Sequence, residues 1–141
     1  MRYKVGWFIP QQIIALTHFV SEVTQDDFNG IVDASNACLL EASQPFNMII
    51  DNRIIKNEQV VSLEVILQSM PQLQNLPLRQ VIMILPRAIG HKAAVMEVQR
   101  MGDVQLRFVD GLTAAFATLR ATDASLNWDL QISGFFVEDI T

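Results

Sequence analysis

The segment FNMIIDNRIIKNEQVVSLEVIL, residues 46–67, indicates the fold class most clearly. It begins as a buried strand, because its first six residues are mostly apolar, and it continues through a short polar loop. A helix is then indicated over residues 60–70, where it stops before Pro71. A strand that leads through a loop into a helix is the repeating unit of α/β folds, whose ligands bind beyond the carboxyl ends of the strands.

The rest of the chain repeats this alternation. Residues 2–8 and 12–19 are rich in aromatic and β-branched side chains and flank a turn signal at Pro10, which predicts an antiparallel hairpin. Three further strands are expected over residues 46–51, 81–85 and 104–109, and helices over residues 24–42, 60–70, 88–101 and from residue 110 onward. The order β-β-α-β-α-β-α-β-α predicts an α/β fold with a five-stranded, mostly parallel sheet, an antiparallel N-terminal strand and about four helices.

Helix ends carry local signals. Thr24 is a good N-cap, with Asp27 three residues later in the first turn. Gly102 is expected to end the third helix, and Asp110 to cap the fourth.

We expect one domain over residues 1–141, with residues 124–141 as a C-terminal tail. The segment ISGFFVEDI, residues 132–140, is too apolar for a solvated end. Packing on its own domain is the favoured interpretation. Covering a sheet edge or crossing to another subunit are the alternatives.

Composition excludes several classes of function. The 141 residues carry a net charge of −5, and the ten Lys and Arg residues are scattered, which argues against a nucleic-acid surface and a polybasic membrane anchor. Cys38 is the single cysteine, which suits a reducing compartment, so we expect a cytoplasmic protein. Hydrophobic residues make up 50% of the chain, an excess that indicates an additional buried face such as a homodimer interface.

Catalytic signatures are missing from the sequence. It contains no Gly-x-Ser-x-Gly elbow and no P-loop, and His18, His91 and Cys38 share no metal-ligand spacing. His18 is interpreted as a strand-face residue and Cys38 as inert core. We therefore predict a protein that is not an enzyme and uses no metal or cofactor.

The segment ILPRAIGHKAAVMEVQRMGDVQLRFVDGLTAAFATL, residues 84–119, reads as a strand ending in Pro, a helix ending in Gly, a strand and a helix. In this pattern the chain resembles the STAS domain, the fold of bacterial anti-sigma factor antagonists, and more closely a branch of small bacterial STAS-like proteins of unknown function. The resemblance spans about residues 2–122. It implies a regulatory module that binds another protein, either a kinase-like anti-sigma factor or a second copy of itself.

The resemblance also bears on the opening stretch. In phosphorylatable antagonists an Asp-Ser-Ser-Gly motif starts the helix after the corresponding strand, and phosphorylation of a Ser there breaks the complex with the kinase. Aligned without gaps, the motif falls on Gln59, Val60, Val61 and Ser62, so valine stands where the resemblance implies an acceptor hydroxyl. Ser62 occupies the Gly position. The resemblance therefore implies an interaction module without the phosphorylation switch.

Two hypotheses place a site near this junction. The first is a protein-binding surface at the start of the second helix, residues 57–62, from Asn57 to Ser62. The second is a sensor that binds an anion or a nucleotide beyond the strand ends, near Asp51, Arg53, Arg87 and His91. Asp51 by itself is better explained by a structural salt bridge with Arg53, Lys56 or Arg87.

Overall fold

The structure, a computed structural model, describes residues 1–56, 68, 77–87, 99–101 and 103–137. Within these ranges lie six strands, two α-helices and one short 3₁₀ helix. They are β1 (Tyr3–Ile9), β2 (Ile13–His18), α1 (Gln25–Glu41), β3 (Phe46–Asp51), β4 (Leu78–Ile84), β5 (Gln99–Met101), β6 (Val104–Val109), α3 (Leu112–Thr122) and the 3₁₀ helix η4 (Trp128–Leu130).

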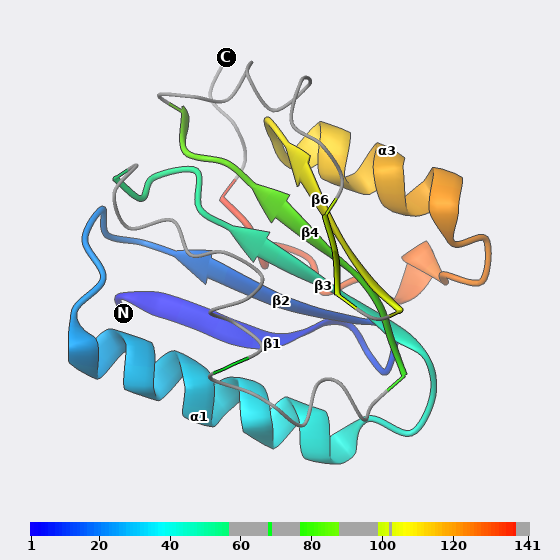
Figure 1. The fold of residues 1–141 in the computed structure, drawn as a ribbon, viewed down its shortest axis with the longest axis horizontal. Helices are drawn as coiled ribbons and strands as arrows, with labels where there is room; N and C mark the ends of the chain where they lie inside the picture. The colour runs from blue at the N-terminus through cyan, green and yellow to red at the C-terminus, as the bar shows by residue number, and fades with distance from the viewer. Residues whose placement is uncertain (57–67, 69–76, 88–98, 102, 138–141) are drawn as a thin grey trace.

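The strands form one mixed sheet in the order β1-β2-β3-β4-β6-β5 (Figure 1). β1 pairs with β2 antiparallel, whereas β2, β3, β4 and β6 form a parallel ladder. β5 pairs antiparallel with β6 at the far edge. The predicted α/β class, the mostly parallel sheet and the antiparallel N-terminal strand are confirmed.

The expected helices are only partly matched. The helix predicted over residues 88–101 is wrong at its end, because residues 99–101 form β5 and pair backbone to backbone with β6, Met101 opposite Val104. Residues 88–98 and Gly102 lie outside the described residues. So does the helix expected over residues 60–70, except for Gln68. The described part of the chain thus holds two α-helices and a sixth strand, not about four helices and five strands.

A local cap sets the start of α1, whereas a contact between strand ends sets the start of α3. Thr24 caps α1 as predicted: its Oγ1 accepts from Asp27 N (3.1 Å), and an Asp27 carboxylate oxygen accepts from Thr24 N (3.0 Å). The predicted Asp110 cap of α3 is wrong, because the N-cap is Gly111. Val109 O still accepts from Leu85 N (3.0 Å), so the strand connection continues to that residue and the helix begins later.

Two apolar layers lie on opposite faces of the sheet, because successive strand side chains alternate between faces. α1 runs along β1 and β2 and covers the first layer (Figure 1). α3 and the C-terminal tail cover the second. In β3 the alternation sends Met48 and Ile50 to the α1 face and Ile49 to the α3 face.

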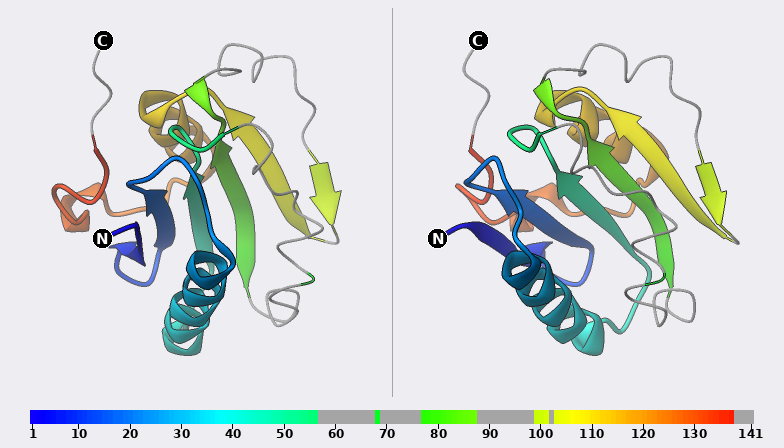
Figure 2. Two further views of the ribbon diagram at one scale, coloured as in Figure 1. Left: turned by 90° about the vertical axis from the view of Figure 1, so that its left-hand side faces the viewer. Right: turned by 60° about the vertical axis from the view of Figure 1, so that its left-hand side comes forward.

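The described part of the tail packs on its own sheet. Phe135 and Phe136 are buried in the layer on the α3 face, and Ile132 N donates to Phe8 O (2.8 Å) at the edge strand. Figure 2 shows the tail beside the N-terminal strand. A Cβ on Gly6 would lie 3.8 Å from the Phe135 ring, so this ring rests directly over β1. The tail thereby covers one end of the β1 edge, which would otherwise expose unpaired backbone groups.

Candidate functional site

A buried ion pair closes the end of β3. The guanidinium of Arg53 grips the carboxylate of Asp51 through two bonds, Nε to Oδ1 and Nη2 to Oδ2, both 2.9 Å. Arg53 N also donates to Asp51 Oδ1 (3.1 Å). The two residues are only 5% and 3% exposed. In a buried site an ion pair is retained only if its geometry is good and additional hydrogen bonds support it, and this pair meets both conditions.

Sheet register supplies a third member. Thr17 stands directly opposite Asp51 in the parallel β2–β3 ladder, and its Oγ1 donates to Asp51 Oδ2 (2.8 Å). Both side chains point to the α3 face, as do those of Ala15 and Ile49, which stand two residues earlier in the same strands. The carboxylate therefore accepts from side chains before and after it in the chain.

The tail supplies the fourth member. Arg53 Nη2 donates to the carbonyl oxygen of Val137 at 2.6 Å. The guanidinium is thus divided between a carboxylate on its own loop and a backbone carbonyl 84 residues away. We call Thr17, Asp51, Arg53 and the Val137 carbonyl the β3 latch.

The loop that follows β3, residues 52–56, is held by backbone bonds to other segments. They join Asn52 N to Ile84 O (3.0 Å), Arg87 N to Arg53 O (3.0 Å) and Lys56 N to Ser21 O (3.2 Å). Lys56 Nζ also forms an exposed ion pair with Glu22. The loop is thereby fixed to the chain beyond β4 and to the segment between β2 and α1. Lys56 is the one exposed residue of this loop, and we call Lys56, Ser21 and Glu22 the loop platform.

On the α1 face a histidine lies behind the latch. His18 is 8% exposed, and burial lowers its pKa below the ordinary value of 6.5. The Asp51 and Asp27 charges and a side-chain hydrogen bond with Asn52 oppose that shift but do not cancel it. His18 is therefore neutral at pH 7. The Nδ2 group of Asn52, also buried, has no hydrogen-bond partner among the described residues.

The structure brings together part of the predicted site. Asp51, Arg53 and the backbone of Arg87 meet at the carboxyl ends of β3 and β4, whereas Asn57, Ser62 and His91 lie outside the described residues. The predicted salt bridge of Asp51 is made with Arg53, and Lys56 pairs with Glu22.

Sequence reasoning missed Thr17, Asn52 and the Val137 carbonyl. Strand alternation could have placed Thr17 on one face with Ile13 and Ala15, but only the register sets it opposite Asp51. Nothing in the sequence signals a backbone carbonyl as a partner.

Cys38, which the sequence predicts to be inert core, and the two tryptophans all make contacts within the fold. Cys38 is half-buried against the α1-face layer, and burial, helped by the Glu41 charge, raises the pKa of its thiol. Trp7 donates from Nε1 to Glu41 Oε2 (2.9 Å). Trp128 packs edge-on against Phe116 with ring centroids 5.4 Å apart.

Neither described helix combines the length and the apolar character needed to cross a bilayer. Among the described side chains, no three His, Cys, Asp or Glu residues gather where a metal ion would bind. Searches against protein-family models, curated proteins and solved structures each returned no match.

Proposed function

We propose that the chain is a STAS-like interaction module that binds another protein through the loop platform and the residues that follow it. The supporting observation is the β3 latch. It fixes the loop after β3 from inside, and a surface that is ordered before binding loses less conformational entropy when a partner docks. The resemblance to anti-sigma factor antagonists supports the same location.

The latch also argues against a site in which Asp51 or Arg53 binds a charged ligand. A ligand that took over the Nη2 group of Arg53 would displace both the Asp51 carboxylate and the Val137 carbonyl. Removing one member of a buried ion pair leaves the other uncompensated, at about 3–5 kcal/mol. A protein surface that covers the loop platform leaves the latch intact.

Charge reversal on the loop platform tests the proposal. Lys56 and Glu22 are exposed, and a solvent-screened pair of this kind contributes little to stability, so Lys56→Glu will fold. With the wild-type chain as bait in native cell extract, we expect a specific partner that Lys56→Glu binds at least tenfold more weakly.

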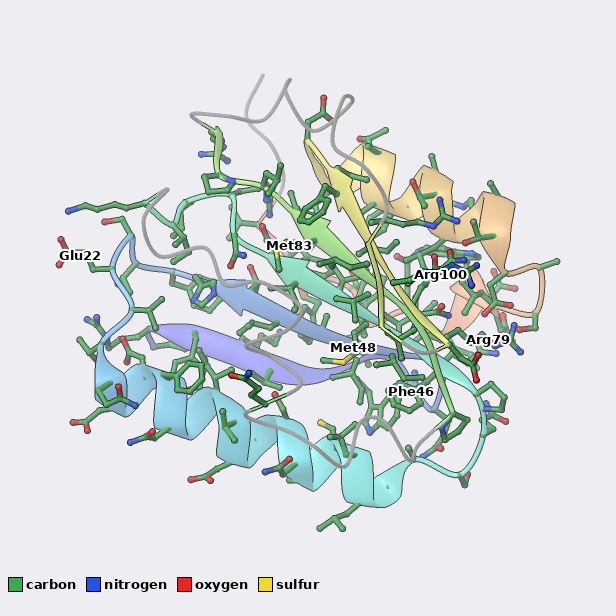
Figure 3. The ribbon with its side chains drawn as sticks, viewed as in Figure 1. Glu22, Phe46, Met48, Arg79, Met83 and Arg100 are labelled. Atoms are coloured by element: carbon green, nitrogen blue, oxygen red, sulfur yellow. The ribbon has the colours of Figure 1, made fainter. Side chains whose placement is uncertain are left out.

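Arg100→Glu is the matched control. Arg100 is exposed on β5, at the opposite end of the molecule from Glu22 (Figure 3). It makes the same charge change and should bind the partner as the wild type does. Equal binding by all three proteins would move the interface elsewhere. A wild-type chain that captures nothing and sediments as a monomer would refute the proposal.

Absence of phosphorylation is a second expected outcome. Incubation with STAS-type kinases and ATP should leave residues 59–62 unmodified, because Val60 and Val61 stand at the two serine positions of the motif. Intact mass and peptide mapping measure this, and phosphate on Ser62 would contradict it.

The buried Nδ2 of Asn52 favours one alternative, a sensor for an anion or a nucleotide at the same strand ends. An unpartnered buried donor costs about 1–3 kcal/mol, which a ligand acceptor would relieve. Thermal shift against phosphate and nucleotides distinguishes the two functions. Stabilisation that is lost in both Asn52→Ala and Arg87→Ala would establish the sensor, and no shift would exclude it.

A further inference from the structure

A cavity of about 270 Å³, partly open to solvent, lies between the end of β1, the first turns of α3 and the tail. Four phenylalanine rings line it, with Leu112 and Ile132 beside them. The rings belong to Phe8, Phe116, Phe135 and Phe136. This aromatic cavity is on the α3 face and shares no lining residue with the β3 latch.

The rings stand at two orientations. Phe8 and Phe116 are parallel within 4°, with centroids 5.5 Å apart. Phe136 is inclined to them by 61° and 59°, at 5.1 and 6.0 Å. The rings thus pack on one another in the stacked and inclined arrangements that aromatic pairs prefer, and Phe116 is the least buried of the four.

The tail curls around the cavity rather than filling it. Six successive residues, 131–136, line it, and the turn is made at Gly134, where φ is +74° and a Cβ would meet no atom within 4 Å. Gln131 and Ser133 are exposed lining residues whose side chains carry hydrogen-bonding groups. The accessible cavity wall therefore combines aromatic carbon with polar groups in comparable amounts, and the polar groups can hydrogen-bond a guest.

We propose that this cavity binds a small planar aromatic molecule of one or two rings that carries one hydrogen-bonding group. Its volume sets the size: an apolar cavity of about 150 Å³ suffices for benzene, and drug-sized sites begin near 300 Å³. The guest displaces water from the ring faces, and its polar group meets the Gln131 or Ser133 side chain. This site does not depend on the protein-binding function proposed above.

Indole, titrated into the ¹⁵N-labelled full chain, tests the proposal. We expect saturable amide shifts concentrated at Leu112 and residues 131–136, with a dissociation constant below about 1 mM. Cyclohexanol has a similar size but no aromatic face, and it should bind at least fivefold more weakly. Equal affinity for the two would refute the aromatic class. Failure of indole to produce saturable shifts at these amides would refute the site.

Three variants that each add one tryptophan locate the binding. Phe116→Trp and Ser133→Trp enlarge side chains that line the cavity, and each should weaken indole binding at least tenfold. Ala117→Trp is the control, since Ala117 is exposed on α3 and does not line the cavity; its affinity should stay within twofold. Amide dispersion verifies that each variant is folded. Folded variants that all bind indole as the wild type does would place the ligand elsewhere.

Discussion

Arg53 is the residue on which the candidate site depends most. Its guanidinium is buried, and it joins the end of β3 to the tail through Asp51 and Val137. A buried charge can be exchanged together with its partner at little cost, but removing one partner strands the other. The role of Arg53 is therefore measured most directly by the free energy of unfolding of its variants.

Arg53→Met should lower the free energy of unfolding by about 3–5 kcal/mol, because the Asp51 carboxylate is left buried and unpaired. Urea denaturation at pH 7 measures the change. Adding Asp51→Leu to that variant removes the stranded charge and should restore more than half of the loss. Arg100→Met, at an exposed arginine, is expected to stay within about 0.5 kcal/mol of the wild type. A cost below 1 kcal/mol for Arg53→Met would contradict the latch.

His18 should make the protein less stable in mild acid. Burial holds its folded pKa below 6.5, against the opposing Asp51 and Asp27 charges and the Asn52 bond, so the unfolded chain binds the proton first as pH falls. Stability is then complete above pH 6.5 and declines below it, by at most about 1.4 kcal/mol per pH unit for one proton.

His18→Gln removes that titrating group while it keeps a polar side chain. Urea denaturation at half-unit steps between pH 7.5 and 4.5 compares the two proteins. The variant should show a shallower decline below pH 6.5. Parallel curves for wild type and variant would show that His18 does not contribute to the pH dependence.

At the scale of an element, α1 contains a glycine whose role is steric. Gly30 lies in mid-helix, where glycine is about 1 kcal/mol less favourable than alanine. A Cβ there would lie 1.9 Å from the Tyr3 hydroxyl and 3.0 Å from the ring carbon that bears it. The helix therefore gives up intrinsic stability so that the Tyr3 ring of β1 can lie against it.

A double-mutant cycle measures the coupling between Gly30 and Tyr3. Gly30→Ala in a Tyr3→Ala background should stabilise the chain by about 1 kcal/mol, because helix propensity acts alone. In the Tyr3 background that gain should vanish or reverse, so the coupling between the two sites is at least about 1 kcal/mol. Additive effects in thermal and urea unfolding would mean that Tyr3 moves aside freely.

At the scale of the whole molecule, the tail joins the aromatic cavity to the β3 latch. Phe135 and Phe136 of the tail pack in the apolar layer on the α3 face, and the carbonyl of Val137 accepts a hydrogen bond from Arg53. A tail that packs in its own chain contributes stability whatever the protein concentration. A tail exchanged between subunits would make stability rise with concentration.

Phe136→Ala should therefore lower the free energy of unfolding by about 3 kcal/mol, the lower end for a buried phenylalanine. The loss should be the same at every protein concentration. Thermal unfolding over a hundredfold concentration range checks this. Val137→Ser is the control, since the exposed Val137 side chain does not make the bond to Arg53, and it should have little effect. A midpoint that climbs with wild-type concentration would favour an exchanged arm.

Features that depend on near neighbours along the chain could be predicted before the structure was known. Hydrophobic periodicity predicted all five expected strands and α1, and the Thr24–Asp27 spacing predicted its capping box. Alternation of strands and helices predicted a mostly parallel sheet, since parallel strands require crossover connections. Each of these signals lies within a few residues, where local sterics and hydrogen bonds act without the rest of the fold.

The contacts at the end of β3 depend instead on how distant segments pack together. Thr17 reaches Asp51 because the register of two parallel strands sets them opposite each other, and Arg53 reaches the Val137 carbonyl because the tail packs on the sheet. Residues 99–101 became a strand because the β6 edge offered backbone partners, against the helical pattern predicted for them. Contacts between residues far apart in the chain depend on register and packing, which no local window of the sequence contains.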